Sequence, residues 1–267
     1  MLRFKNLGSG SAGNATVVEA GSGLHLKRLL VDCGLGLRAL EARLTQAGLQ
    51  MGQIDAIFVT HEHADHIGCA RQLALRHRTP VWMSQGTASA LSDAAGLFAS
   101  QRADFDGLLM RAQDSISIDL GELQITPFTV PHDAREPLQL RCSDGARHLG
   151  VLTDLGHATD HVREHLSGCN ALLLECNHDA DLLDTSSYPA FLKKRVAGRL
   201  GHLSNPDSAA IAKSLDHAGL KHVVAAHLSR QNNRPELARA ALAGALGRAP
   251  EDIAVADQAT GCDWISV

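Results

Sequence analysis

The chain has 267 residues, of which 45% are hydrophobic and 20% are charged, and its net charge is −4 at pH 7. This length and composition are typical of a soluble globular protein with one large core, and they exclude a disordered or fibrous chain. The negative charge excludes a global basic field for nucleic acid or an anionic membrane, so such binding needs a local patch. Fifteen histidines outnumber the two Trp, one Tyr and six Phe together, which points to metal or acid–base chemistry.

The strands and helices predicted along the chain alternate without a linker or repeat, so we expect residues 1–267 to form a single domain. Short β-rich runs predict strands over Thr16–Ala20, Leu26–Asp32, Ile54–Thr60, Pro80–Ser84, Ser115–Leu120, Leu123–Val130, Leu138–Ser143, His148–Thr153, Ala171–Glu175, His222–Ala226 and Ile253–Ala256. Helical periodicity predicts helices over Leu37–Ala47, His66–Arg76, Thr87–Ser100, Ala190–Val196, Asn205–Ala218 and Pro235–Leu246. Gly121-Glu122 indicates a hairpin, and the whole pattern favours an α/β (α+β) fold of two packed sheets flanked by helices.

The cysteines and the longest apolar runs indicate the cellular location of the protein. The six cysteines lack CxxC spacing, and the first residues show no charged and apolar leader, so we expect reduced, structural thiols and a cytoplasmic protein. The longest apolar runs, such as Ala171–Leu174 and Val223–Ala226, are far shorter than the roughly eighteen residues that span a bilayer. We therefore expect no membrane association.

The most specific local signal is the sequence His-Glu-His-Ala-Asp-His at positions 61–66, directly after a run that predicts a buried strand. On a turn, His61 and His63 can face one metal ion. Asp65 and His66, at the start of the next helix, can face a second. Two cations about 3.5 to 4 Å apart can activate a water and stabilise both the attacking and the leaving oxygen, so this spacing predicts a dinuclear hydrolytic site.

This string matches HxHxDH, the hallmark of the metallo-β-lactamase fold superfamily. One residue before the string and three residues after it complete the resemblance in the expected order. They are Asp32 in Val-Asp-Cys-Gly, His132 in Val-Pro-His-Asp, Asp154 in Leu-Thr-Asp-Leu-Gly and His227 in Ala-Ala-His-Leu-Ser. The resemblance implies an αββα sandwich of two mixed sheets flanked by helices. The metal ligands that it implies are His61, His63, Asp65, His66, His132, Asp154 and His227. Asp154 would bridge both ions, and Asp32 would orient the loop that carries the motif.

The aspartate at position 154 argues against antibiotic hydrolysis, because the best-known metal-dependent β-lactamases carry a cysteine there. A ligand set of His and Asp lacks the thiolate that would single out zinc. Of the two divalent ions expected, zinc is favoured, and manganese and iron remain open. Cys33 and Cys69 are expected to be small core residues, and Glu62 to hold the loop and not the metal.

Four segments outside the metal motifs resemble the YycJ/WalJ branch of this superfamily, and the resemblance covers nearly the whole chain. They are residues 7–14, Glu175-Cys176-Asn177-His178-Asp179, Gly201-His202-Leu203-Ser204-Asn205 and residues 227–233. The members of that branch are described as DNA exonucleases, so the resemblance implies a nucleic-acid substrate, DNA in particular, held through phosphate contacts. Ala12 and Pro131 replace serines that are common among relatives, and we expect a metal site in spite of both changes.

A second group of residues is expected to act on the substrate. His202 resembles a histidine that assists the leaving oxygen in related tRNA 3′-processing nucleases, so we predict that it is a general acid or a phosphate clamp. The expected substrate-binding residues are Asn14, His178, Ser204 and Ser229. Asn14 would bind a phosphate from a glycine-rich turn, and Ser204 or Asn205 would also cap the next helix. For His178, a role toward substrate and a supporting role both remain open.

Local cations complete the prediction, because both loops that carry active-site histidines also carry basic residues. They are Lys193, Lys194, Arg195 and Arg199 before His202, and Arg230 and Arg234 after His227. With so few aromatic residues, we expect recognition through the nucleic-acid backbone and weak sequence specificity.

The sequence therefore predicts a dinuclear metal-dependent hydrolase, a phosphodiesterase or nuclease of the DNA exonuclease type. We expect a hydroxide between the two ions, held by Asp65 and Asp154, to attack a phosphodiester while His202 assists the leaving group. Two alternatives stay open: a glyoxalase II-like thioesterase or small-ester hydrolase, and a noncatalytic member that binds nucleic acid or a partner. The choice between DNA and RNA, the choice between exo and endo action and its polarity, the metal in the cell and the oligomeric state also stay open at this point.

Overall fold

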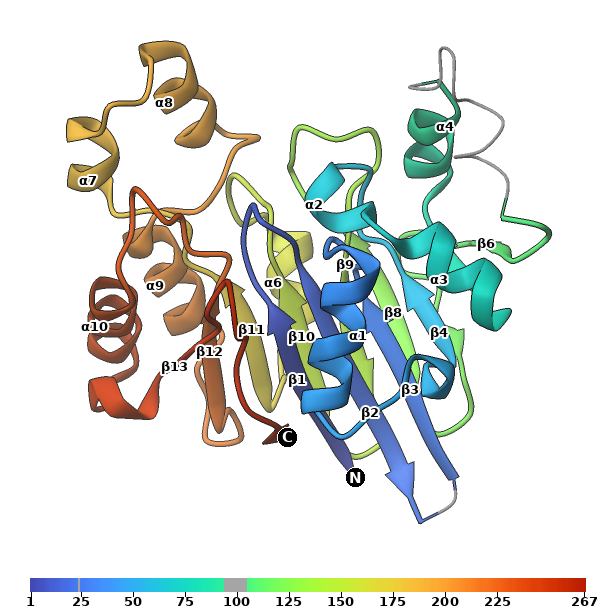
Figure 1. Cartoon of the computed structure of the whole chain (residues 1–267). Helices are drawn as coiled ribbons and strands as arrows, with labels where there is room; N and C mark the ends of the chain where they lie inside the picture. Colours follow the sequence, from blue (N-terminus) through green and yellow to red (C-terminus); the bar gives the residue numbers. More distant parts are fainter. Residues whose placement is uncertain (24, 94–104) are drawn as a thin grey trace.

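The strands form two seven-stranded sheets that pack face to face, with helices on both outer surfaces (Figure 1). The computed structural model describes residues 1–23, 25–93 and 105–267. The first sheet has the order β14-β1-β2-β3-β4-β5-β6, and the second has the order β13-β12-β11-β10-β9-β8-β7. The αββα sandwich of two mixed sheets that the sequence predicts is confirmed.

Each sheet has an antiparallel half and a parallel half. In the first sheet β14, β1, β2 and β3 pair antiparallel, and β3, β4, β5 and β6 pair parallel. Its strands are β1 (Leu2–Gly8), β2 (Ala15–Ser22), β3 (His25–Val31), β4 (Ala56–Phe58), β5 (Val81–Met83), β6 (Leu109–Arg111) and β14 (Ile265–Ser266). In the second sheet β7 to β10 pair antiparallel, and β10 to β13 pair parallel. Its strands are β7 (Ile118–Asp119), β8 (Gln124–Thr129), β9 (Leu138–Ser143), β10 (His148–Leu152), β11 (Ala171–Glu175), β12 (His222–Ala226) and β13 (Ala254–Val255).

The helices connect these strands and cover the outer faces of the sheets. They are α1 (Leu37–Gln46), α2 (Ala64–Ile67), α3 (Ala70–His77), α4 (Gln85–Asp93), α6 (Asp160–Leu166), α7 (Ala180–Thr185), α8 (Ala190–Val196), α9 (Asn205–Ser214) and α10 (Pro235–Leu246), with the 3-10 turns η1 (Met51–Gln53) and η2 (Pro250–Asp252). Ser204 caps α9 by accepting a hydrogen bond from the Asp207 amide, as the sequence predicts. α10 starts with Pro235 and ends before Gly247, which has a left-handed φ of 63°. None of the helices in the described residues has the length and apolar composition of a membrane-spanning segment.

Three hydrophobic cores among the described residues explain why the inner strands are apolar on both faces. Successive side chains of a strand point to opposite faces, so Ala171 and Leu173 of β11 pack between the sheets. Leu172 and Leu174 of the same strand pack under α6, α9 and α10. A third core lies between the first sheet and the helices α1, α3 and α4.

Some predicted boundaries are wrong, and the causes are local. The helix predicted over His66–Arg76 is broken into α2 and α3, because Gly68 has a φ of 27° and a Cβ there would lie 2.3 Å from the Cys33 carbonyl oxygen. β1 was not predicted, although the alternation of Leu2 and Phe4 with Arg3 and Lys5 is typical of a strand with one buried face. The short helices α6 and α7 were also missed. Residues 94–100 of the helix predicted over Thr87–Ser100 lie outside the described residues.

Replacing Phe4 of β1 with alanine should lower the free energy of unfolding by about 3 to 5 kcal/mol. Phe4 is 0% exposed and packs in the core between the sheets, so Phe4→Ala leaves a cavity there. Urea denaturation measures the change. The control is Ile116→Ala, since Ile116 is 58% exposed and its truncation should change stability by less than about 0.5 kcal/mol. Equal losses in the two variants would contradict this packing.

Candidate metal centre

Three of the expected site residues directly follow strands and share an unusual backbone conformation. Asp32 follows β3, Asp154 lies two residues beyond β10, and His227 follows β12. Their φ angles are 62°, 55° and 54°, a left-handed region that costs energy for any residue except glycine. The surrounding contacts hold these angles; the amide of His227, for example, donates to Ser9 Oγ at 2.6 Å. Such strained positions cluster at functional sites.

The loop between β4 and α2 carries the His-rich motif, and Asp32 organises it. One oxygen of Asp32 accepts hydrogen bonds from the Thr60 amide at 2.9 Å and from the Thr60 hydroxyl at 3.0 Å. The other oxygen lies 2.8 Å from His66 Nδ1. Thr60 Oγ1 also lies 3.0 Å from His61 Nδ1, a role that sequence reasoning did not assign to it. Asp32 and Thr60 thus leave the Nε2 atoms of both histidines directed to the centre.

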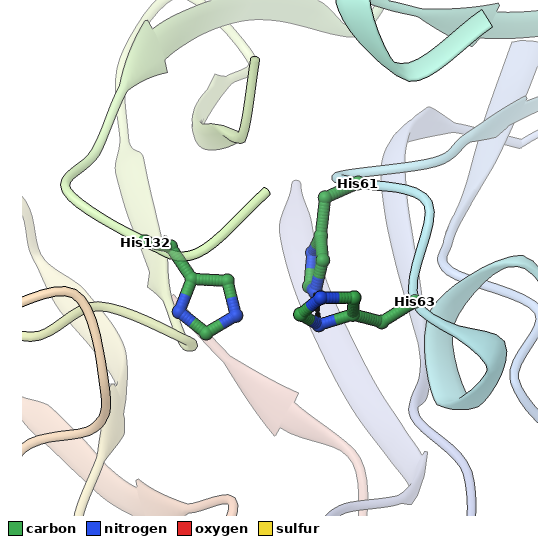
Figure 2. A group of neighbouring side chains, drawn as sticks. All are labelled: His61, His63 and His132. Carbon is green, nitrogen blue, oxygen red and sulfur yellow. Dashed lines mark hydrogen bonds between the residues drawn. The ribbon is translucent and has the colours of Figure 1, made fainter. Parts of the chain in front are cut away.

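His61, His63 and His132 form the first cluster of candidate ligands (Figure 2). One ring nitrogen from each histidine lies within 4.8 Å of the others. His61 Nε2 and His63 Nδ1 are only 3.0 Å apart. His132 is oriented by a contact of 3.2 Å between its Nδ1 and the Gly201 carbonyl oxygen. Its Nε2 is buried and has no hydrogen-bond partner among the described residues, so this cluster fits a metal ion.

The protonation state of these histidines also suits a metal ligand, which must offer a lone pair. Burial, together with the neighbouring His66, lowers the pKa of His61 well below its ordinary value. Burial lowers the pKa of His132 as well. Both imidazoles are therefore neutral at physiological pH.

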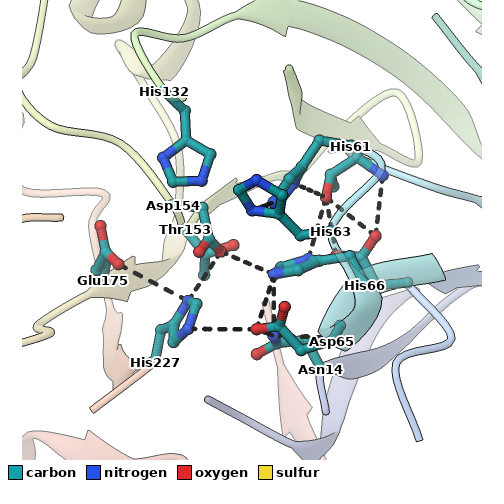
Figure 3. A network of polar contacts seen from close by, with 12 residues as sticks. Asn14, His61, His63, Asp65, His66, His132, Thr153, Asp154, Glu175 and His227 are labelled. Carbon is teal, nitrogen blue, oxygen red and sulfur yellow. Dashed lines mark hydrogen bonds and ion pairs between the residues drawn. The ribbon is translucent and has the colours of Figure 1, made fainter. Parts of the chain in front are cut away.

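Asp65, His66, His227 and Asp154 form the second cluster (Figure 3). Oδ2 of Asp65 lies 3.7 Å from His66 Nε2 and 4.0 Å from His227 Nε2. Oδ2 of Asp154 lies 3.2 Å from His66 Nε2 and 2.8 Å from His227 Nδ1. Asp154 also groups with His61 and His66 within 4.8 Å, so the two clusters adjoin at this carboxylate.

The electrostatics of the second cluster favour positive charge. Burial would raise the pKa of Asp154, but His227 and His66 lower it well below its ordinary value. Burial would lower the pKa of His66, but the carboxylates of Asp154 and Asp32 raise it well above its ordinary value. The two clusters together hold all seven predicted ligands, and they are compatible with a dinuclear site for divalent metal ions.

Glu175, at the end of β11, supports the predicted acid His202. This carboxylate is 0% exposed, and its Oε1 lies 2.7 Å from His202 Nδ1. Its Oε2 accepts hydrogen bonds from the amides of Leu155 and Leu203, each at 3.2 Å. Burial would lower the pKa of His202, but Glu175 raises it to about 9. Sequence reasoning assigned no role to Glu175, although a charged residue at the end of an apolar strand is a signal that could have identified it.

A cavity of about 380 Å³ opens onto both clusters and lies within the usual size range of ligand sites. Asp65, Asp154, His202 and His227 line one part of it. It is also lined by residues at and before α8, which are Tyr188, Leu192, Arg195 and Val196.

The four predicted substrate-binding residues lie at different depths. Ser229 lines the cavity. The side chain of Asn14 accepts from the Gly10 amide at 2.7 Å, and its Nδ2 lies 3.0 Å from His66 Nε2, so it holds the motif loop. Ser204 caps α9 and forms a β-bridge with His178, which is itself buried. Roles toward substrate for Asn14, His178 and Ser204 stay predictions.

Comparison with known proteins finds relatives along nearly the whole chain. The family model of the beta-lactamase superfamily domain matches residues 27–228. Exodeoxyribonuclease YycJ of Bacillus anthracis is 35% identical over 238 residues, which cover 89% of this chain and 86% of that protein. Exodeoxyribonuclease WalJ of Streptococcus pneumoniae is 31% identical over 258 residues, covering 95% and 91%. The crystal structure of the metallo-beta-lactamase fold protein YhfI from Bacillus subtilis has the same fold, with a TM-score of 0.74 and 17% identity over 99% of this chain and 98% of that one.

Replacing Glu175 with glutamine should lower the pKa of His202 from about 9 toward the ordinary histidine value. Glu175→Gln keeps the shape of the side chain and an oxygen for the two amides, but it removes the negative charge that stabilises the imidazolium. NMR titration of chelator-treated protein measures the pKa. Glu236→Gln, at an exposed glutamate on α10, is the matched control. An unchanged pKa of His202 in Glu175→Gln would contradict the pairing of Glu175 with His202.

Proposed function

The chain belongs to the β-lactamase superfamily, in the branch that contains YycJ and WalJ, and on that basis we propose that this metal-dependent hydrolase is a dinuclear phosphodiesterase that degrades DNA from an end. One observation carries the proposal: seven ligand-type side chains form two adjoining clusters, and four of them line the same cavity as His202, namely His63, Asp65, Asp154 and His227. The names of the two relatives, both exodeoxyribonucleases, support DNA as the substrate.

The two clusters divide the proposed metal ligands. His61, His63 and His132 would hold one ion, and Asp65, His66 and His227 would hold the other. Asp154 lies where the clusters adjoin and would contact both. When bound, divalent ions would lower the pKa of a water molecule and neutralise charge on the phosphate. We assign zinc first, because neutral histidines with carboxylates suit it, with manganese and iron as the other candidates.

His202 is assigned as the general acid. Glu175 engages its Nδ1, which leaves Nε2 as the nitrogen that donates a proton to the leaving oxygen. A pKa of about 9 keeps this imidazole protonated at neutral pH, the form that an acid requires. Asp65, which lines the same cavity, is assigned to orienting the attacking water.

Contacts to the substrate are assigned to polar and basic groups at the cavity. Ser229 and Arg195 line it directly. Lys194, on the exposed side of α8, adds positive charge for the phosphates of a longer strand. A cytoplasmic location is part of this proposal, since all six cysteines lie within the described residues and are free there.

Purified protein should shorten an end-labelled DNA oligonucleotide stepwise in the presence of zinc or manganese, and a chelator should stop the reaction. His61→Ala should abolish this hydrolysis, because it removes a nitrogen from the first cluster. The assay compares single-stranded DNA, duplex DNA, RNA of the same sequence and an acyl-glutathione thioester, with metal content measured by mass spectrometry.

The matched control is His222→Ala, an exposed histidine at the opposite end of β12 from His227, which should keep activity and metal content. Hydrolysis of the thioester without hydrolysis of nucleic acid would replace the proposal with a thioesterase. Wild-type turnover by His61→Ala would remove the metal assignment.

His202→Ala should keep both bound ions and lose about 10²- to 10⁴-fold in kcat on DNA, because a sugar alkoxide needs a proton to leave. With a p-nitrophenyl phosphodiester, whose leaving group needs no proton, the loss should be much smaller. Steady-state kinetics on both substrates, with metal analysis, measure the effect. An equal loss on the two substrates would exclude the general-acid role.

A further inference from the structure

We propose that Tyr188, Leu192 and Val196 form a subsite for the nucleobase next to the scissile phosphate, and we call these three residues the base wall. The inference rests on the proposed function and specifies how that function selects its substrate. It assigns the enzyme to strand ends, where a base has an uncovered face.

The base wall belongs to an arm that contributes little to the sandwich. The arm contains α7 and α8, between β11 and α9, and Figure 1 shows both helices standing apart from the sheets at the end of the molecule where α2 also lies. In the described structure α7 buries Leu183, and no residue of α8 is buried. An amphipathic helix normally covers its apolar stripe with protein, so α8 is unusual.

Three residues of the arm with large apolar surfaces line the active-site cavity. Leu192 and Val196 are one turn apart on α8, and Tyr188 precedes Pro189, the N-cap residue of that helix. All three line the same cavity as Asp154 and the other site residues. All three are only partly buried, and they belong to none of the three cores that the described residues form. Apolar surface is stabilised when it is covered, and here only an occupant of the cavity can cover it.

The rest of the cavity identifies the chemistry of that occupant. Arg195 lies between Leu192 and Val196 in sequence and lines the same cavity, and its Nε is 2.7 Å from Asp133 Oδ2. Asp133 in turn lies 3.4 Å from His132 Nε2. The cavity therefore places the proposed metal cluster and a cation beside an aromatic and aliphatic wall. A nucleotide matches this division, since it joins an anionic phosphate to a flat, largely apolar base.

The base wall restricts which bases of a DNA substrate can be bound. Inside a duplex both faces of a base are covered by its neighbours, so a base can stack on Tyr188 only at an end of the strand or after it is unstacked. An aromatic ring stacks on any base, which predicts weak sequence preference. The small number of aromatic residues led us to expect recognition through the backbone alone, but one ring at the cavity is sufficient for one base.

The test measures KM and kcat on two single-stranded DNA oligonucleotides, one of normal sequence and one with an abasic residue at the end from which nucleotides are removed. Tyr188→Ala should raise KM for the normal strand on the order of tenfold and leave kcat nearly unchanged. Tyr188→Phe keeps the ring and should stay within about twofold of wild type. On the abasic strand the wild-type enzyme should have a KM as high as that of Tyr188→Ala on the normal strand. Tyr188→Ala should not raise the KM for the abasic strand any further.

Phe191→Ala is the matched control, because Phe191 is an aromatic residue of α8 that is 75% exposed and lies outside the cavity lining. It should leave KM unchanged, and metal content and circular dichroism should be unchanged in all three variants. An equal rise of KM on both strands, or the same rise in Phe191→Ala, would overturn the subsite while the nuclease function stands. If the wild type degrades no DNA, the proposed function fails and the subsite falls with it.

Discussion

The buried carboxylate of Asp154 is the group on which the rest of the site depends. A buried charge is costly unless it is paired, and Asp154 is paired by His66 and His227 at 3.2 and 2.8 Å. His66 comes from the first sheet and Asp154 from the second, so this contact joins the two halves of the sandwich at the cavity. Asp32 then holds the far side of His66. The arrangement stabilises positive charge, which is the electrostatic condition for binding divalent ions.

The topology explains why these groups meet. Strands from both sheets have their carboxyl ends at the same end of the sandwich. The residues with left-handed backbone angles, Asp32, Asp154 and His227, lie just beyond these strand ends. The regular strands fix the backbone up to these ends, and the site residues follow directly where the regular structure stops.

The arm of α7 and α8 has the opposite character. In the described chain it is held to the sandwich by a few polar contacts, such as that of Arg195 with Asp133, and by the burial of Leu183. Segments with few buried apolar contacts open at low free energy, so the arm can adjust its position while the metal cluster stays fixed. In the proposed function, the metal ligands follow rigid strand ends, and the base is bound by a weakly packed arm.

The sequence by itself predicted the fold class, and its resemblance to a known family supplied the seven candidate ligands. Alternating apolar runs specify buried strands, and polar ligand-type residues directly after such runs mark strand ends, as His61 and Asp154 do. Only the tertiary structure decided three features of the site. They are the pairing of Glu175 with His202, the break between α2 and α3 at Gly68, and the position of Tyr188 in the lining of the cavity. Each of these depends on contacts between segments far apart in the chain, such as the Cys33 carbonyl against Gly68, and local sequence pattern carries no information about such contacts.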